Sequence, residues 1–268
     1  MGDSNKKPKE KHFVLVHGAC HGAWCWYKVK PLLEAAGHHV TVLDMAASGI
    51  NLKKINDLKT IHDYSEPLIE FMTSLPDDQK VILVGHSLGG LNLAVVMDMF
   101  PYKIEVSIFL MAFLPDTDHT FSFIFDQFLG FIPEGEKDDY WLDTETTSMG
   151  DPKKDLTTIL MGPQFLSKLY HLSPPQDYEL AMILRRPSSF FLHDLWKPET
   201  KFSKKNYGSV RRVYVLCDED RASPQAFQRW MIKNGGVKEV KELKGSDHMP
   251  MFSIPNQLCH CLLEIAMN

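Results

Sequence analysis

Short apolar runs, many of them β-branched, alternate with longer amphipathic stretches along most of this chain, and this alternation limits the fold more than any other feature. Strands are expected at Phe13–Val16, Val40–Leu43, Val81–Val84, Ile104–Phe113, Val213–Cys217 and Val237–Leu243. Helices are expected at Trp24–Ala36, Tyr64–Ser74, Gly89–Met99, Ser223–Lys233 and Asn256–Met267. Continuous apolar strands that alternate with helices predict an α/β fold, with a parallel sheet covered by helices on both faces.

One long stretch, from about residue 115 to about residue 204, breaks this alternation. It is rich in aromatic residues, turn signals and short helical patterns. We interpret residues 115–204 as a cap inserted into the α/β core, which then consists of residues 11–114 and 205–268. No separate linker flanks the insert, so we expect it not to fold independently, and we expect residues 1–10 to form a flexible tail.

Charge and cysteine content narrow the class of protein. The chain has 29 Lys and Arg against 34 Asp and Glu, a formal charge of −5, which argues against a dedicated nucleic-acid binder. No run of 18 apolar residues is present, which excludes a transmembrane helix, and the polar start has no apolar core of a signal peptide. Five cysteines, an odd number, suggest reduced thiols. We therefore expect a cytoplasmic protein without membrane or nucleic-acid partners.

The strongest chemical signal is the sequence Gly-His-Ser-Leu-Gly at residues 85–89. It follows an expected strand and precedes an expected helix, which is the context of a G-x-S-x-G nucleophile elbow. A sharp turn there lifts the Ser87 hydroxyl from the sheet edge and points the helix N-terminus at a developing oxyanion. The motif indicates Ser87 as a nucleophile and the Leu88 N–H as one oxyanion donor.

A serine nucleophile needs a base and an acid that orients it, in the chain order Ser, acid, His. His248 follows the last expected strand, where an imidazole can reach back over the strand ends, and we assign it as the general base. Asp218, Glu219 and Asp220 follow the preceding strand, and the residues alone do not decide firmly between Asp218 and Asp220. Asp247 is adjacent to His248, so we expect it to shape the loop instead.

The second oxyanion donor is expected in the loop after the first strand, at residues 17–22. Gly18 allows close backbone approach there, and we choose the Ala19 N–H as the donor. His17 and His21 have metal-ligand spacing, but no third ligand is evident, so we expect neither a metal nor any cofactor.

Several motifs together resemble the plant methylesterase branch of the α/β-hydrolases. That branch includes esterases like salicylic acid-binding protein 2, methyl jasmonate esterases and polyneuridine aldehyde esterase, and the hydroxynitrile lyases are close relatives. The similarity runs from about residue 11 to residue 266. It rests on HGACHGAW at residues 17–24, DYSEPL at 63–68, GHSLGG at 85–90, YGSV at 207–210 and SDHM at 246–249.

The resemblance implies an α/β-hydrolase fold with a mainly parallel six-stranded sheet and a cap. It implies a catalytic triad of Ser87, Asp220 and His248, because the acid of the family ends a Cys-x-Glu-Asp segment, here residues 217–220. It also implies oxyanion donors at Ala19 and Leu88. By position it implies a substrate pocket lined by Gly18, Phe113, Phe128, Trp141 and Ile159.

The resemblance favours ester hydrolysis over cyanohydrin cleavage. The rubber-tree and cassava lyases have Thr where this chain has Gly18, and Lys where it has Met249. Without that Lys, no nearby positive charge stabilises cyanide. We therefore predict a carboxylesterase for the methyl ester of a small apolar plant metabolite, such as methyl jasmonate, methyl salicylate, methyl indole-acetate or an alkaloid carbomethoxy ester. The alternatives are a hydroxynitrile lyase, or a small-molecule binding protein on the same fold. By analogy with the family, we expect a possible homodimer.

Overall fold

The protein is represented by a computed structural model that describes residues 10–137, 139–148, 150–151 and 155–268. The tail expected at residues 1–10 therefore lies outside the described residues, apart from Glu10. None of the helices in the described part of the chain combines the length and the apolar character needed to cross a lipid bilayer.

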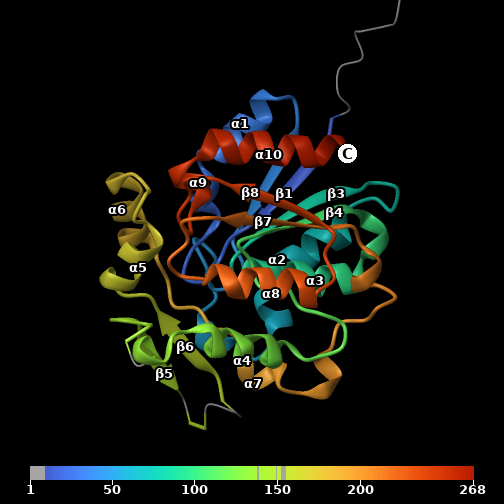
Figure 1. Ribbon diagram of the computed structural model, residues 1–268. Coiled ribbons are helices and arrows are strands. Elements are labelled where there is room, and N and C mark those ends of the chain that lie inside the picture. The colour runs from blue at the N-terminus through green and yellow to red at the C-terminus, as the bar shows by residue number, and fades with distance from the viewer. Residues whose placement is uncertain (1–9, 138, 149, 152–154) are drawn as a thin grey trace, which may run out of the picture.

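A six-stranded parallel sheet forms the centre of the described structure (Figure 1). Its spatial order is β2-β1-β3-β4-β7-β8, and every neighbouring pair runs parallel. The strands are β1 (His12–Val16), β2 (His39–Leu43), β3 (Val81–His86), β4 (Ile104–Leu110), β7 (Arg212–Cys217) and β8 (Glu239–Leu243). All six coincide with expected apolar runs, and the predicted α/β architecture with a six-stranded parallel sheet is confirmed.

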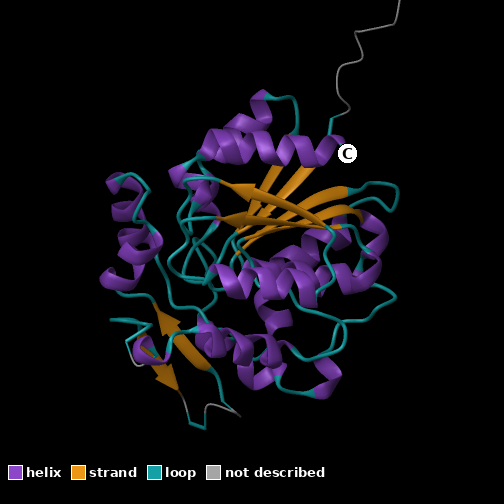
Figure 2. Ribbon diagram, in the orientation of Figure 1, coloured by secondary structure: helices purple, strands orange, loops and turns teal. Residues whose placement is uncertain are grey.

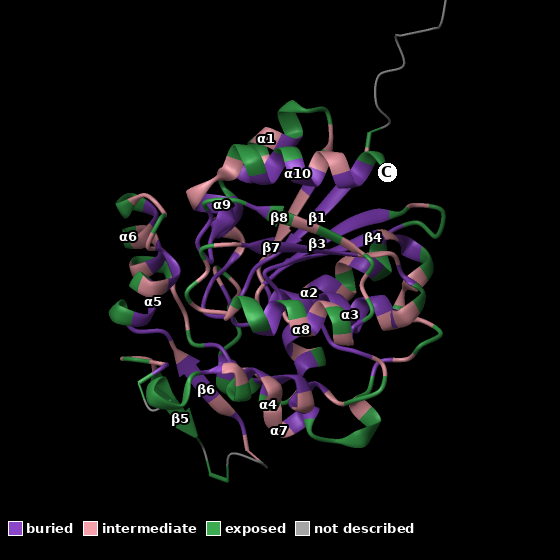
Figure 3. Ribbon diagram, in the orientation of Figure 1, coloured by how far each residue is buried: buried purple, intermediate pink, exposed green. Residues whose placement is uncertain are grey.

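Helices cover both faces of this sheet (Figure 2). On one face α1 packs against α10, and on the other α2 packs against α3. These helices and α8 on the second face have the bounds α1 (Val29–Ala35), α2 (Ile61–Ser74), α3 (Gly89–Met99), α8 (Gln225–Asn234) and α10 (Pro255–Met267). The inner strands β1, β3, β4 and β7 lie almost entirely buried between the two layers, while the edge strands β2 and β8 are partly exposed (Figure 3). The outward faces of the helices are exposed as well. Side chains that project beyond the carboxyl ends of the strands are therefore the ones that can reach a substrate.

The first expected helix, Trp24–Ala36, is wrong as a continuous element. The structure has a 3-10 turn, η1 (Ala23–Trp26), and then α1. Pro31 explains the break, because proline has no N–H to bond to the carbonyl four residues earlier and its ring collides with that carbonyl.

Helix α2 begins at Ile61, three residues before its expected start at Tyr64. A capping box sets this boundary: the Asp63 N–H donates to Thr60 Oγ1 at 3.1 Å, and the Thr60 N–H donates to Asp63 Oδ2 at 2.9 Å. The reciprocal bonds satisfy donors that the helix itself leaves unpaired. Strand β4 ends at Leu110 rather than Phe113, because Met111 has a φ of 47°, outside the range of a strand.

Between β4 and β7 the chain forms a separate group of elements (Figures 1 and 2). Most are helical, but the group also has an antiparallel hairpin that the sequence did not indicate. The elements are α4 (Phe121–Phe131), η4 (Glu134–Glu136), β5 (Glu145–Ser148), β6 (Thr157–Leu160), α5 (Pro163–Leu169), α6 (Pro175–Leu184), α7 (Leu192–Leu195) and η5 (Pro198–Thr200). Helix α4 contacts α8 of the core, so this group lies against the sheet's helical layer. We refer to residues 115–204 as the cap.

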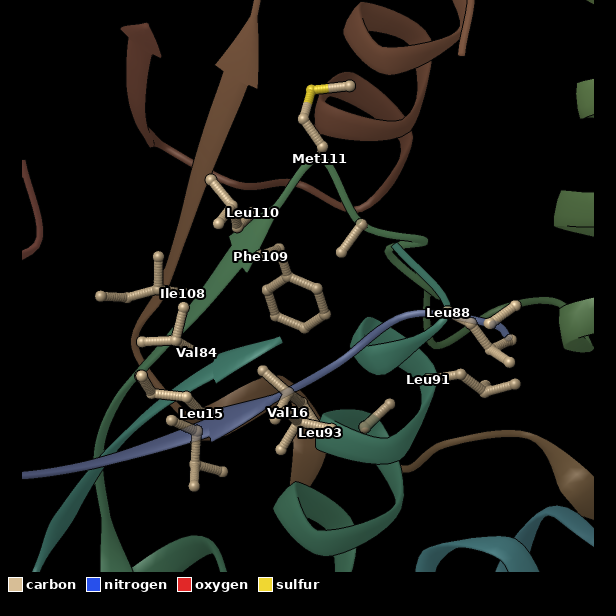
Figure 4. Packing of buried hydrophobic residues seen from close by; sticks show 14 of the residues in the cluster. Leu15, Val16, Val84, Leu88, Leu91, Leu93, Ile108, Phe109, Leu110 and Met111 are labelled. Atoms are coloured by element: carbon tan, nitrogen blue, oxygen red, sulfur yellow. The ribbon is translucent and has the colours of Figure 1, made fainter. Parts of the chain in front are cut away.

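The core beneath the turn between β3 and α3 is densely apolar. Figure 4 shows side chains of β1, β3, β4 and α3 meeting there, and all of those labelled are buried. Complete burial of one such Leu, Val or Phe side chain contributes about 1.5–3 kcal/mol. The turn between β3 and α3 therefore lies on a densely packed core. Such packing can hold a strained backbone conformation in the turn.

Candidate active site

Ser87 lies at the tight turn between β3 and α3. Its φ is 53°, in the left-handed region that non-glycine residues rarely adopt, at a cost of about 1–3 kcal/mol. Backbone hydrogen bonds hold it: its N–H donates to the Leu110 carbonyl at 3.2 Å, and the Phe113 N–H donates to its carbonyl at 3.0 Å. The neighbouring strand β4 and the residues that follow it thus maintain the strained turn.

His248 lies on the loop between β8 and α9 (Pro250–Ser253). Its Nδ1 is 2.8 Å from Asp220 Oδ2, and both side chains are almost completely buried. Burial by itself lowers the pKa of His248, but the negative charge of Asp220, its hydrogen bond and the charge of Asp247 outweigh burial and raise it above its usual value. A carboxylate in this position fixes the imidazole with its proton on Nδ1, which leaves Nε2 free to accept a proton.

The two aspartates that sequence reasoning left open have different partners. Asp220 directs Oδ2 to His248, while its Oδ1 accepts hydrogen bonds from the N–H groups of Ala222 at 2.6 Å and Ser223 at 3.1 Å. Asp218 instead accepts from the Gly245 N–H at 2.7 Å. In this geometry Asp220 faces the imidazole and Asp218 fastens the neighbouring loop.

The loop after β1 lies directly against the Ser87 turn. A Cβ added to Gly18 would lie 2.9 Å from Ser87 Cβ, closer than real Cβ atoms approach, so the backbone there has no room for a side chain. Ala19 follows in the loop, and Leu88 is the N-terminal cap residue of α3. Neither the Ala19 N–H nor the Leu88 N–H donates a hydrogen bond within the described part of the chain.

A narrow cavity of about 50 Å³ joins these groups. Ser87, His248 and Ala19 line it, together with three residues expected in the pocket, Phe113, Phe128 and Trp141. The remaining lining residues, which sequence reasoning missed, are Met111, Ala112, Met161, Phe165, Leu169, Phe190, Ala222, Ser223, Phe227 and Met231. Phe227 and Met231, four residues apart on α8, were detectable as the apolar face of the helix that follows the acid.

The structure places two expected pocket residues elsewhere. Gly18 lies behind Ser87, where it allows the close approach described above. Ile159 lies on β6 and pairs with Ser188, with backbone bonds of 2.8 and 2.9 Å. That pairing places it at a separate hollow, shared with Phe190 and Phe191.

The cavity is apolar except at its reactive end. Among the described residues that line it, the side chains with hydroxyl or nitrogen groups are Ser87, Ser223, His248 and the indole of Trp141, and none is Lys, Arg, Asp or Glu. The described residues also contain no group of three or more His, Cys, Asp or Glu placed to hold a metal ion. The arrangement suits nucleophilic attack on an uncharged, largely apolar molecule, because Ser87, His248 and Ala19 all line the same cavity.

Comparison with known proteins finds similar chains over nearly the whole length of this one. A family model described as the alpha/beta hydrolase family matches residues 13–259. Salicylic acid-binding protein 2 of Nicotiana tabacum is 54% identical over 257 residues, which are 96% of this chain and 97% of that protein. Methylesterase 1 of Arabidopsis thaliana is 51% identical over 264 residues, which are 98% of each chain.

Among solved structures, a crystal structure of polyneuridine aldehyde esterase superposes with a TM-score of 0.91 at 45% identity. The superposition covers 96% of this chain and all of that one. The similarity therefore extends through the cap and both parts of the core.

Proposed function

This chain belongs to the alpha/beta hydrolase family, and from that premise we propose that it is a carboxylesterase that cleaves the methyl ester of a small apolar plant metabolite. The observation that carries the proposal is the convergence of Ser87, His248 and Ala19 on one apolar cavity, with Asp220 2.8 Å behind the imidazole. Relatives named as methylesterases over nearly the full length support the same reaction.

We propose acyl transfer in two steps, with Ser87 as the nucleophile and His248 as the base. His248 Nε2 takes the hydroxyl proton as Ser87 Oγ attacks the ester carbonyl, and Asp220 stabilises the imidazolium that forms. The Ala19 and Leu88 N–H groups hold the oxyanion, and each such donor is typically worth about 2.7–4 kcal/mol. Methanol leaves with the proton from His248. Water then gives a proton to His248 as it attacks the acyl carbon, and the acid is released as Ser87 Oγ takes that proton back. No metal or cofactor takes part.

Two positions favour hydrolysis over cyanohydrin cleavage. Met249 follows His248 where the rubber-tree and cassava lyases have Lys, and no cationic side chain lines the described cavity. Gly18 occupies the position where those lyases have Thr. A Cβ at Gly18 would lie 2.9 Å from Ser87 Cβ, so the backbone of this chain has no room for a Thr side chain there unless it shifts. The site thus lacks both the Thr hydroxyl and the Lys charge that stand at these two positions in those lyases.

The cavity also narrows the substrate class. Its aromatic and Met side chains, contributed by the segment that follows β4, by the cap and by α8, suit a planar or otherwise slim apolar acyl group. Methyl salicylate, methyl jasmonate, methyl indole-acetate and an alkaloid carbomethoxy ester are the candidates. We propose that residues 115–204 act as the cap that encloses this group, with residues 11–114 and 205–268 as the core.

We also propose a cytoplasmic location and a homodimer. The five cysteines are all buried free thiols in the structure, which suits a reducing compartment. Ile50, Leu52 and Ile183 are 89%, 97% and 76% exposed, and burial of these side chains against a second copy would remove apolar surface from water. Light scattering on the purified protein tests the dimer directly.

The deciding experiment is methanol release from a panel of the four candidate esters, with Ser87→Ala as the matched control. We expect turnover of at least one ester by the wild type and none above background by the variant. If the wild type releases no methanol from any ester but cleaves mandelonitrile or only binds an acid tightly, the esterase proposal is wrong.

A further inference from the structure

Two loops carry the proposed catalytic groups, and one short segment of the cap contacts both. Residues 17–22 include Ala19, and residues 244–249 include His248. Residues 170–173, which connect α5 to α6 and which we name the cap link, hydrogen-bond to a side chain in each loop. Resting on the proposed function, we propose that the cap link holds both catalytic loops in working geometry, with Tyr170 and Ser173 as positioning residues.

The first contact acts on the direction of the Ala19 N–H. The carbonyl of Gly18 accepts hydrogen bonds from His17 Nδ1 at 2.8 Å and from the His21 N–H at 3.4 Å. In a trans peptide the N–H points away from the carbonyl, so a fixed Gly18 carbonyl sets where the Ala19 N–H points. The His21 side chain secures the next peptide as well, because its Nδ1 is 2.8 Å from the Ala19 carbonyl oxygen. His21 and His17 therefore hold the orientation of the proposed oxyanion donor together.

Tyr170 in turn fixes His21. The Tyr170 hydroxyl donates to His21 Nε2 at 2.5 Å, and the two rings stack with an angle of 8° between their planes. Because the Ala19 carbonyl oxygen can only accept, the ring proton of His21 is on Nδ1, which leaves Nε2 to accept from the Tyr170 hydroxyl. Burial lowers the pKa of His21 to about 4 and raises that of Tyr170 well above its usual value. Both groups stay neutral at physiological pH, so the two hydrogen bonds, from Tyr170 to His21 and from His21 to the Ala19 carbonyl, keep their directions.

The second contact acts on the His248 loop through Asp247. Its Oδ2 accepts from the Leu172 N–H at 3.0 Å and from Ser173 Oγ at 2.8 Å, while its Oδ1 accepts from the Met249 N–H at 2.9 Å. Asp247 is completely buried, so these three donors replace its hydration. One carboxylate thus joins the cap link to the backbone on either side of the proposed base.

Other contacts fasten the cap to the core without touching either loop. Tyr27 donates its hydroxyl to Asp177 Oδ1 on α6 at 2.7 Å, and Lys28 pairs with the other oxygen at 2.5 Å. Loss of the Tyr27 hydroxyl weakens the attachment of the cap but leaves both catalytic loops unchanged. Tyr27→Phe is therefore the matched control for Tyr170→Phe, since each removes one hydroxyl and keeps the ring.

The test measures kcat and KM for Tyr170→Phe, Ser173→Ala, Tyr27→Phe and Ser87→Ala on 4-nitrophenyl acetate and on the best methyl ester. The rate of Ser87 labelling by a fluorophosphonate and the thermal midpoint are measured in parallel. We expect Tyr170→Phe to lower kcat about tenfold with KM nearly unchanged, and to slow labelling similarly, because a misdirected oxyanion donor affects only the transition state.

Ser173→Ala gives a different pattern. We expect it to reduce turnover of the methyl ester more than that of 4-nitrophenyl acetate, because methanol needs a proton from His248 to leave and 4-nitrophenolate does not. Tyr27→Phe should match the wild type in both kcat and labelling.

Three results would overturn the inference. The first is that Tyr170→Phe and Ser173→Ala keep the kcat and the labelling rate of the wild type. The second is that Tyr27→Phe loses as much kcat as they do. The third is that the loss of kcat in each variant is proportional to the fall in its thermal midpoint. If the wild type shows neither Ser87-dependent hydrolysis nor labelling, the proposed function itself is wrong and the inference falls with it. Wild-type activity with unaffected cap-link variants refutes the inference alone.

Discussion

Replacing Asp220 by Asn tests the proposed triad sharply, because the structure dictates how the new amide must sit. Asp220 Oδ1 accepts two backbone N–H groups, from Ala222 and Ser223. In Asp220→Asn the amide oxygen remains with these donors, so the NH₂ group faces His248 Nδ1. The imidazole must then accept there and carry its proton on Nε2, where it cannot take the proton of Ser87.

The expected loss follows from this reversal. The same change in the triad of a serine protease lowers kcat about 10⁴-fold, which at about 1.36 kcal/mol per tenfold is about 5.5 kcal/mol. The variant also loses the charge that raises the pKa of His248. Because hydrolysis needs the neutral imidazole, activity rises with pH through that pKa. The acid limb of the pH–rate profile should therefore move to lower pH in the variant.

Steady-state hydrolysis of the best methyl ester over a pH series measures both effects, and Asp218→Asn is the matched control. Asp218 follows the same strand but bonds to the Gly245 N–H, so its loss should leave kcat within a few fold and the acid limb in place. A kcat for Asp220→Asn within tenfold of the wild type, or a larger effect at Asp218, would refute the assignment of Asp220.

Three further predictions follow from the packing and charge of the site. Gly90→Ala should lower the thermal midpoint markedly, since its Cβ would lie 2.2 Å from the Phe113 carbonyl oxygen. Phe128→Leu should shift the ranking of esters in a competition assay towards bulkier acyl groups, while Ile159→Val, outside the cavity, should not. Inhibition by the free acid product should weaken as pH rises through the pKa of His248, which inhibition constants over a pH series measure, because only the imidazolium attracts a carboxylate.

The sheet and the nucleophile turn were predictable because strong local signals coincide there. The run Val81–Val84 has the composition of a buried strand, and the glycines around Ser87 permit the tight turn of a G-x-S-x-G motif. A single residue can shift the boundary of a helix even though the apolar pattern continues past it. In the first expected helix, Trp24–Ala36, Pro31 marks the break, but the apolar pattern predicted one continuous helix. The hairpin strand Glu145–Ser148 is exposed at every residue, so no apolar alternation marked it.

The choice between Asp218 and Asp220 shows what residue patterns alone leave undetermined. Both follow the same strand, and their roles differ only because the backbone turns one carboxylate to Gly245 and the other to His248. The resemblance to the methylesterases pointed to Asp220, which is the one that faces the imidazole. The pocket was harder to predict, because Ile159 pairs with Ser188 through contacts that depend on how the whole cap folds.

Ester hydrolysis and acid binding, two activities considered for this chain, would depend on different protonation states of the same imidazole, that of His248. A carboxylate inside this cavity meets apolar side chains and no Lys or Arg among the described lining residues, so burying it there is costly unless the His248 imidazolium pairs with it. The neutral imidazole, in contrast, is the form that activates Ser87 in the proposed mechanism. Asp220 raises the pKa that separates the two forms, so acid binding prevails below that pKa and hydrolysis above it. Tight binding of an acid at low pH is therefore compatible with the proposed esterase. At higher pH the neutral imidazole no longer pairs with the carboxylate, so the same acid, formed as the product of ester hydrolysis, is released.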